Sequence, residues 1–144
     1  MKIYFISLTV ALFAAVSDVK SRKITNRFII RGYMIGLIYQ IIQFFLKGDF
    51  TYVKDAFYGF LLPYLFIFLY SLNVIGAADI KLFSVIGLII GTKRVLLLIV
   101  ISFVIAGCMG IFAISILKKE KNYELPFALA EFISLILLCV KDMV

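Results

Sequence analysis

Residues 76–87 read GAADIKLFSVIG, so a carboxylate, Asp79, and an ammonium, Lys81, stand at the entrance of a long apolar run. Ionisable side chains at or within apolar segments are costly to bury, and their default interpretation is functional. The same order of acid, branched apolar residue and lysine occurs earlier, in SDVK at 17–20, where the acid is Asp18. The chain therefore has two similar pairs of an aspartate and a lysine, each at the edge of an apolar segment.

The composition predicts the class of fold. Of the 144 residues, 65% are hydrophobic and 16% are charged, and the mean hydropathy is +1.15. A soluble domain carries about 45–50% apolar and about 25% charged residues. The excess apolar residues come in runs, which favours an all-α, polytopic membrane helix bundle. No repeat, low-complexity tract or linker divides residues 1–144, so we expect one domain.

The apolar runs predict about six transmembrane helices, since a spanning helix needs about 20 mostly apolar residues. The predicted segments are 2–17, 27–46, 56–73, 79–91, 94–117 and 125–140. The first resembles a signal peptide but is interpreted as a retained span, because the chain keeps re-entering the membrane. The fourth is too short to cross the membrane alone.

Small residues mark two helix faces that can pack closely. Gly32 and Gly36 form a G-x-x-x-G spacing in the second segment, and Ala106 and Gly110 have the same spacing in the fifth. Such spacings allow two membrane helices to approach closely. Pro63, inside the third segment, is tolerated because neighbouring groups can satisfy the freed carbonyl.

The distribution of basic residues predicts the orientation. Six alternating segments put loops one, three and five on one side, with eight Lys or Arg residues against six on the other. The eight are Lys20, Arg22, Lys23, Arg27, Lys81, Lys118, Lys119 and Lys121. Because basic residues concentrate on cytoplasmic loops, we expect the first, third and fifth loops in the cytoplasm. Asp18 and Asp79 then share that face at similar depth.

Several classes of function are disfavoured by the residue types. The net charge of +7 is explained by topology, and no basic stripe with interleaved exposed aromatics predicts nucleic-acid binding. Histidine is absent, and Cys108 and Cys139 form no C-x-x-C pair. A zinc or redox site therefore has little support, and no cofactor is expected.

Three acidic residues remain as functional candidates. Of the eight acids, five lie in loops or at the terminus, where a solvated charge costs little. The others are Asp18, Asp79 and Glu131. Glu131 either supports a site, receives a basic part of a substrate, or is a packed structural acid. Lys20 and Lys81 either stabilise carboxylate charge or anchor helices at the interface.

The two aspartates suit aspartic proteolysis. Two carboxylates held close in a partly desolvated site cannot both ionise, so one keeps a proton and the pair acts as acid and base. The ionised member takes a proton from water, and the protonated member supports the scissile carbonyl. Because the pair titrates as a unit, neither aspartate is assigned the acid or the base role.

The residues around both aspartates resemble the type IV prepilin peptidases. Their G-x-G-D motif reads Gly76, Ala77, Ala78, Asp79 here, with Ala78 in place of the second glycine. A positive φ at that position would strain an alanine. The first-aspartate motif reads DVKSRKITN at 18–26, ending at Asn26, with threonine in place of the family proline. The segment LPFA at 125–128 resembles the opening of the family's last helix.

The resemblance implies a short-form, single-domain prepilin leader peptidase in the cytoplasmic (inner) membrane. Its substrates would be prepilins or pseudopilins, cut between a basic leader and an apolar helix, and its neighbours would be a pilus or secretion machinery and membrane lipids. Asp18 and Asp79 would be catalytic. Gly76, Ala78, Lys81, Lys20, Asn26 and Glu131 are possible supporting residues, and Asn26 is expected as a supporting group or helix cap. Methylation, the particular prepilin and the oligomeric state stay open.

Two other functions are compatible with the sequence. A small proton-coupled transporter is the first, because intramembrane carboxylates also relay protons; Glu131 is its best candidate acid. A non-catalytic membrane scaffold is the second, supported by the two small-residue helix faces. A transporter predicts proton-linked flux, and a scaffold predicts that Asp18 and Asp79 tolerate asparagine.

Overall fold

A computed structural model of the chain describes residues 2–21, 24–72, 75–115 and 127–143. Within these ranges the chain is helical and contains no strand. The elements are α1 (Lys2–Ser21), α2 (Asn26–Lys47), α3 (Phe50–Leu61), η1 (Leu62–Phe66), α4 (Ile67–Ser71), α5 (Ala77–Ile90), α6 (Thr92–Ser115) and α7 (Phe127–Lys141). Since α3, η1 and α4 run on as one segment, the six predicted segments are recovered. Arg22, Lys23, Lys118, Lys119, Lys121, Leu125 and Pro126, which carried parts of the predicted motifs and loops, lie outside the described residues.

The connection between α2 and α3 is shorter than predicted. The third segment was expected to start at 56, after a polar loop, but α3 begins at Phe50. Gly48 ends α2 in the left-handed region, with φ of 63°, which glycine adopts without strain. The Asp49 carboxylate then caps α3 by accepting a hydrogen bond from the Thr51 amide at 2.8 Å. This two-residue turn converts the predicted loop into helix.

Pro63 changes the helical type of the third segment without ending it. Proline lacks the amide hydrogen that an α-helix interior requires. Around Pro63 the chain adopts the 3-10 helix η1 and then returns to α-helix in α4. Pro63 itself is buried. The segment thus continues to the turn that precedes Asp79.

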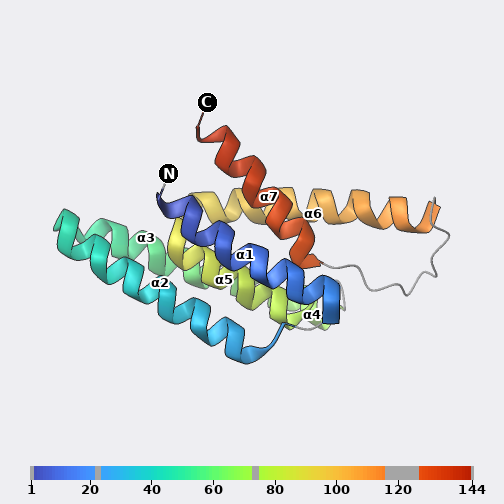
Figure 1. Cartoon of the computed structure of the whole chain (residues 1–144), viewed down its shortest axis with the longest axis horizontal. Helices are drawn as coiled ribbons and strands as arrows, with labels where there is room; N and C mark the ends of the chain where they lie inside the picture. The colour runs from blue at the N-terminus through green and yellow to red at the C-terminus, as the bar shows by residue number, and fades with distance from the viewer. Residues whose placement is uncertain (1, 22–23, 73–74, 116–126, 144) are drawn as a thin grey trace.

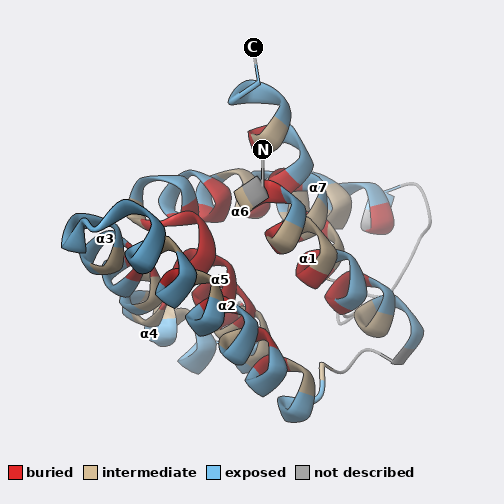
Figure 2. Ribbon diagram, turned by 60° about the vertical axis from the view of Figure 1, so that its left-hand side comes forward, coloured by how far each residue is buried: buried red, intermediate tan, exposed pale blue. Residues whose placement is uncertain are grey.

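Helix α5 is the centre of the bundle. Every residue from Leu82 to Ile90 is buried, and α5 contacts α1, α2, α3, α6 and α7. Figure 2 shows this as a buried helix enclosed by partly exposed ones. A helix that is apolar on all sides is stable in this central position. Its 14 residues make it shorter than a spanning helix, as the sequence predicted.

Two glycine contacts bring α2 and α3 close to α5. A Cβ added at Gly32 would lie 2.9 Å from Val85 Cγ1, and one at Gly36 would lie 2.8 Å from Leu88 Cδ2. The prediction that this G-x-x-x-G spacing packs closely against another helix is confirmed. A Cβ at Gly59 would overlap the carbonyl oxygen of Gly87, and one at Gly87 the carbonyl oxygen of Gly59. Here the backbones of α3 and α5 meet directly.

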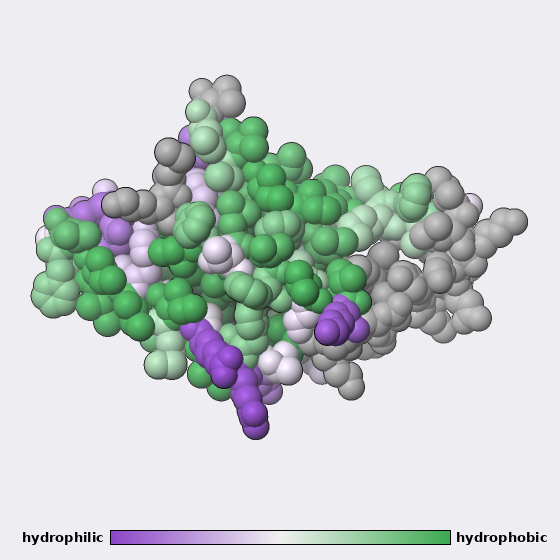
Figure 3. All heavy atoms as spheres, in the orientation of Figure 1, coloured by the Kyte–Doolittle hydropathy of each residue, from purple (hydrophilic) through white to green (hydrophobic). Residues whose placement is uncertain are grey.

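The outer surface is apolar. Exposed large hydrophobic side chains occur on α1, α2, α3, α4, α6 and α7, and Figure 3 shows that apolar side chains cover the middle of one face. Four helices, Ile3–Lys20, Asn26–Lys47, Phe50–Ser71 and Thr92–Ala113, are long and apolar enough to cross a membrane. A protein with this surface is a membrane protein. The predicted small-residue face at Ala106 and Gly110 is only half-buried.

The helices alternate in direction, so each end of the bundle collects a defined set of residues. The C-terminal end of α1 meets the N-terminal end of α7, because Asp18 and Ala128 are hydrogen-bonded. The opposite end brings Tyr4 of α1 to Asp142, which follows α7, and both chain termini lie there in Figure 1. The first end is called the aspartate end below.

Candidate active site

Asp79 lies in the first turn of α5, directly after a turn of small residues. Gly76 precedes the helix in an extended conformation, and its carbonyl accepts a hydrogen bond from the Asp79 amide at 3.1 Å. A Cβ added at Gly76 would lie 2.8 Å from Asp79 Oδ2. The requirement for glycine at this position is therefore one of space, because the Asp79 carboxyl group folds back over it.

Ala78 is compatible with the turn. It lies inside α5 with helical backbone geometry and is half-buried. Of the residues that the structure describes, the glycines with positive φ are Gly48 and Gly91, which are far from this motif in the chain. No positive φ is needed at Ala78, so alanine in place of the family glycine causes no backbone strain here.

Asp18 lies in the last turn of α1, where α7 begins. Its Oδ2 atom accepts a hydrogen bond from the Ala128 amide at 3.1 Å. Ala128 is the second residue of α7, and the amides in the first turn of a helix have no partner within it. The positive end of the helix also favours a nearby negative charge. Helix α7 thus orients the Asp18 carboxylate and stabilises it.

The two aspartates approach each other at the aspartate end. Asp79 feels the charge of Asp18, and burial and this repulsion are the two main influences that oppose a negative charge on it. Both side chains are half-buried. The two carboxyl groups come from positions 61 residues apart in the chain, and their negative charges repel each other. Such a pair can hold one proton between its members.

Glu131 lies on α7, one helical turn after Ala128. It is fully buried, and its charge interacts with those of Asp79 and Asp18. Neither carboxyl oxygen has a hydrogen-bond partner among the described residues. The three acids that the sequence singled out are thus gathered at one end of the bundle. No three Asp, Glu or Cys side chains in the described ranges are arranged to hold a metal ion.

The lysines of the two motifs point elsewhere. Lys81 Nζ donates to Asn26 Oδ1 at 3.3 Å, which ties the start of α2 to α5. Asn26 is the first residue of α2, and Thr25 occupies the N-cap position, so Asn26 does not cap the helix. Lys20 is exposed.

A polar cluster that the sequence did not single out joins the first half of α5 to its neighbours. The Tyr33 hydroxyl lies 3.1 Å from the Tyr64 hydroxyl and donates to the Lys81 carbonyl at 3.3 Å. Ser84 donates to the Phe60 carbonyl at 2.8 Å. Together these bonds join α2, the third segment and α5 near Asp79. No periodicity or motif distinguishes these residues from ordinary span residues.

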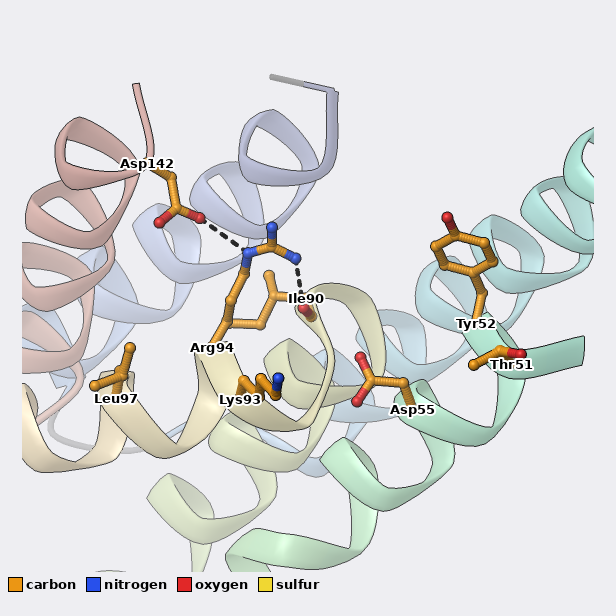
Figure 4. Close-up of a pocket in the computed structure, with 8 residues that line it drawn as sticks. All are labelled: Thr51, Tyr52, Asp55, Ile90, Lys93, Arg94, Leu97 and Asp142. Atoms are coloured by element: carbon orange, nitrogen blue, oxygen red, sulfur yellow. Dashed lines mark hydrogen bonds and ion pairs between the residues drawn. The ribbon is translucent and has the colours of Figure 1, made fainter. Parts of the chain in front are cut away.

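The opposite end of the bundle contains two adjoining cavities, of about 510 and 540 Å³. They lie about 16 Å from the aspartate end, since α5 rises about 1.5 Å per residue from Asp79 to Ile90. Figure 4 shows how Arg94, Asp142 and Asp55 face the first cavity.

Arg94, Asp142 and Asp55, which line these cavities, have local partners. Arg94 Nε pairs with Asp142 Oδ2 at 2.9 Å, and Asp142 also accepts a hydrogen bond from the Tyr4 hydroxyl. The Tyr4 and Arg94 bonds hold the pKa of Asp142 below its usual value. Asp55 caps α6 by accepting from the Thr92 amide at 3.1 Å. The hydrogen bonds and ion pair among Tyr4, Arg94 and Asp142 therefore join α1, α6 and the end of α7 beside these cavities. Neither candidate aspartate lines either cavity.

Comparison with known proteins places this geometry in a family. Residues 5–111 match the type IV leader peptidase family, and this range includes Asp18 and Asp79 with both of their motifs. The match covers most of the chain, so the chain belongs to the type IV leader peptidase family, a family of peptidases. No curated protein and no solved structure matches the chain. Helix α7, with Ala128 and Glu131, lies beyond the matched residues.

Proposed function

We propose that the chain is a membrane aspartyl endopeptidase that removes the basic leader from type IV prepilins or pseudopilins, with Asp18 and Asp79 as its catalytic pair. The observation that carries this proposal is that Asp18, held by the Ala128 amide at the end of α1, and Asp79, in the first turn of α5, lie at the same end of the bundle, where α1 packs against α5. Membership of a leader peptidase family supplies the reaction class. Neither observation alone would assign both the residues and the bond that they cleave.

The reaction uses one proton shared by the two carboxyl groups. The ionised carboxylate takes a proton from a water molecule, and the water oxygen attacks the carbon of the scissile carbonyl. The protonated carboxyl group donates to the carbonyl oxygen, so the charge that develops there is stabilised. The carbon–nitrogen bond then breaks, and the leaving amine departs with a proton. The Ala128 amide keeps the Asp18 carboxylate oriented throughout.

The location of the pair fits the substrate class. Asp18 lies in the last turn of the span Ile3–Lys20, and Asp79 lies in the first turn of α5, so both lie near one surface of the predicted membrane layer. A prepilin presents its scissile bond at this depth, between a basic leader outside the membrane and an apolar helix within it. The excess of basic residues on the loops at this end supports a cytoplasmic location in the inner membrane.

Cleavage of a prepilin tests the proposal directly. The chain and a prepilin are reconstituted in liposomes, and the loss of the leader is followed by gel mobility and by mass spectrometry of the new amino terminus. We expect Asp18→Asn and Asp79→Asn each to abolish cleavage. Asp142→Asn is the matched control, because it removes a carboxylate at the opposite end of the bundle.

The outcomes separate the alternatives. Cleavage by both asparagine variants at the wild-type rate would exclude the catalytic pair and leave a scaffold as the better interpretation. Proton-linked flux in the same liposomes, lost in Glu131→Gln and independent of prepilin, would instead indicate a transporter. A correct cleavage product that appears only with both aspartates present supports the peptidase.

A further inference from the structure

The two cavities at the end of the bundle opposite the aspartates adjoin each other and have a polar lining. Tyr52, Asp55, Ile90 and Arg94 line both of them, and Figure 4 shows that residues of α3 and α6 line the first cavity from opposite sides. Their volumes of about 510 and 540 Å³ lie within the range of about 300–1,000 Å³ that small-molecule sites occupy. A polar space of this size holds water or a polar ligand.

Hydrogen bonds between helices hold the walls of the second cavity in place. Gln40, which is 9% exposed, donates from Nε2 to the Leu88 carbonyl at 2.6 Å. This carbonyl lies in the last turn of α5, where helix carbonyls have no partner within the helix. The Asp55 carboxylate accepts from the Thr92 amide at 3.1 Å, and the Thr92 hydroxyl donates to the Asp55 carbonyl at 2.8 Å. These bonds join α2 and α3 to the corner between α5 and α6, so the cavity is preformed.

The lining of the cavities offers positive charge to a ligand. Three cations and two carboxylates line them: Lys47, Lys93, Arg94, Asp55 and Asp142. Both carboxylates already accept from donors of the protein, Asp142 from Arg94 Nε at 2.9 Å and Asp55 from the amide that starts α6. Within the described part of the chain, neither lysine forms an ion pair with a carboxylate. An anion in this space would therefore meet cations that no acidic side chain neutralises.

The cations lie at the ends of membrane-spanning helices. Lys47 is the last residue of the span Asn26–Lys47, and Lys93 and Arg94 lie in the first turn of the span Thr92–Ala113. The Lys47 ammonium lies 3.8 Å from the centroid of the Tyr52 ring, and both residues line the second cavity. Basic side chains at this depth interact with the phosphates of lipid headgroups.

Polar side chains continue inward from Lys47 along α2. Gln43 and Gln40 lie one and two helical turns before Lys47, and both line the second cavity. Seven residues of helix correspond to about 10 Å. The order from the surface inward, first cations and then amides, matches the order of phosphate and ester groups in a phospholipid. Amide hydrogens can donate to the ester oxygens.

We propose that these cavities bind the phosphate and glycerol part of an anionic phospholipid. The phosphate lies beside Arg94, which lines both cavities, between Lys47 on one side and Lys93 on the other. A free phosphate ion shares this charge chemistry, but the exposed Phe44 and Phe45 of α2 also give acyl chains an apolar surface. The proposal is independent of the peptidase reaction, because neither candidate aspartate lines the cavities.

Thermal unfolding of the purified chain in a neutral detergent tests the proposal, with phosphatidylglycerol, phosphatidylcholine or inorganic phosphate added in separate titrations. A ligand that binds only the folded protein raises the unfolding temperature as its concentration increases. We expect phosphatidylglycerol to reach its half-maximal effect at a concentration at least about tenfold lower than phosphatidylcholine, whose headgroup carries a compensating cation. Inorganic phosphate should give no shift at the concentrations at which phosphatidylglycerol saturates.

Substitutions in the lining locate the effect. Lys47→Gln and Lys93→Gln should each raise the half-maximal concentration of phosphatidylglycerol about fivefold, the size of one basic contact with an anionic lipid. Lys54→Gln is the matched control: it removes the same charge at the same end, but Lys54 lies over the Phe50 ring, 5.6 Å from its centroid, and lines neither cavity. Its half-maximal concentration should stay within about twofold of wild type.

Gln43→Trp keeps every charge and fills part of the second cavity, so it should weaken the effect of phosphatidylglycerol by about tenfold or more. The unfolding temperature without lipid shows whether each variant folds. Where Gln43→Trp fails to fold, the two lysine variants decide, because both lysines are exposed and their substitution leaves the packing intact.

Equal weakening by Lys54→Gln and Lys47→Gln would show that the lipid responds to surface charge in general, and would overturn the proposal. An equal shift with inorganic phosphate would assign the cavities to a free anion instead of a lipid. The absence of any shift with phosphatidylglycerol would leave water as their content and would also overturn the proposal. None of these outcomes bears on cleavage by Asp18 and Asp79, so the two proposals fail separately.

Discussion

The backbone amide of Ala128 donates a hydrogen bond to Asp18 Oδ2 at 3.1 Å, across 110 residues of chain. This bond ties the last helix to the first at the point where Asp79 also lies. A hydrogen bond to a charged group contributes about 1.5–3 kcal/mol. Its function is to fix the direction of a carboxylate that, at the end of a helix next to a loop, would otherwise sample several orientations.

Ala128→Pro should reduce prepilin cleavage by about tenfold or more, because proline has no amide hydrogen to donate and the lost bond is one to a charged group. Proline is tolerated in the first turn of a helix, so α7 should persist. Initial rates in liposomes measure the effect. Ala128→Gly keeps the amide and is the matched control; an equal loss of activity in both variants would show that packing, not the hydrogen bond, is responsible.

Gly76→Ala should lower cleavage by up to about 100-fold, the scale of a misplacement of about 1 Å in a catalytic group. The new Cβ would lie 2.8 Å from Asp79 Oδ2, so the carboxyl group must move. Unfolding temperature should hardly change, because Gly76 is exposed. Ala78→Gly is the control in the same turn and should retain activity, at a stability cost of about 0.5–1 kcal/mol for glycine in a helix. Greater loss of activity in the control than in Gly76→Ala would contradict this account.

Gly87→Ala should destabilise the bundle by about 1–3 kcal/mol or more, the usual cost of overpacking. Its Cβ would overlap the carbonyl oxygen of Gly59, and backbone atoms cannot yield as a flexible side chain does. The measurement is the unfolding midpoint in detergent. Gly107→Ala is the matched control, because it lies within α6 with nothing within 4 Å of an added Cβ. That substitution should be neutral or stabilising by about 0.5–1 kcal/mol.

The stability contributed by the Tyr4–Asp142–Arg94 bonds, at the end of the bundle opposite the aspartates, should depend on pH. The Tyr4 and Arg94 bonds lower the folded-state pKa of Asp142 below its ordinary value of 3.8. The stabilisation is therefore present above pH 3.8 and is lost as the pH falls through the folded-state pKa. Asp142→Asn should lower the unfolding temperature slightly at pH 7, since the pair is largely exposed.

Below the folded-state pKa of Asp142, the unfolding temperatures of Asp142→Asn and wild type should converge, because the carboxyl group of the wild type is then protonated. A difference between the two proteins that stays constant from pH 7 down through this acid range would show that the charge of Asp142 contributes nothing. Prepilin cleavage at pH 7 should be unaffected by the substitution.

The sequence predicts helix boundaries well where a capping or breaking residue stands at the end of an apolar run. The close packing at Gly32 and Gly36 was predicted from residue type alone. The start of α3 was missed, because KGDFTYVKD is polar enough to resemble a loop. Asp49 and Thr51 form a local cap that turns this stretch into helix, and composition does not distinguish the two.

The sequence by itself determined that the chain is a membrane helix bundle, because apolar helices of this length are stable only when they face lipid or pack against one another. The sequence also singled out Asp18, Asp79 and Glu131, because an acidic residue at or within an apolar segment is costly to bury and therefore rare. The tertiary structure decided which helix ends meet: that the Ala128 amide holds Asp18, that Gly59 and Gly87 touch, and that Glu131 is fully buried. These relationships depend on how helices pack across large separations in the chain, and local sequence patterns carry no record of that packing.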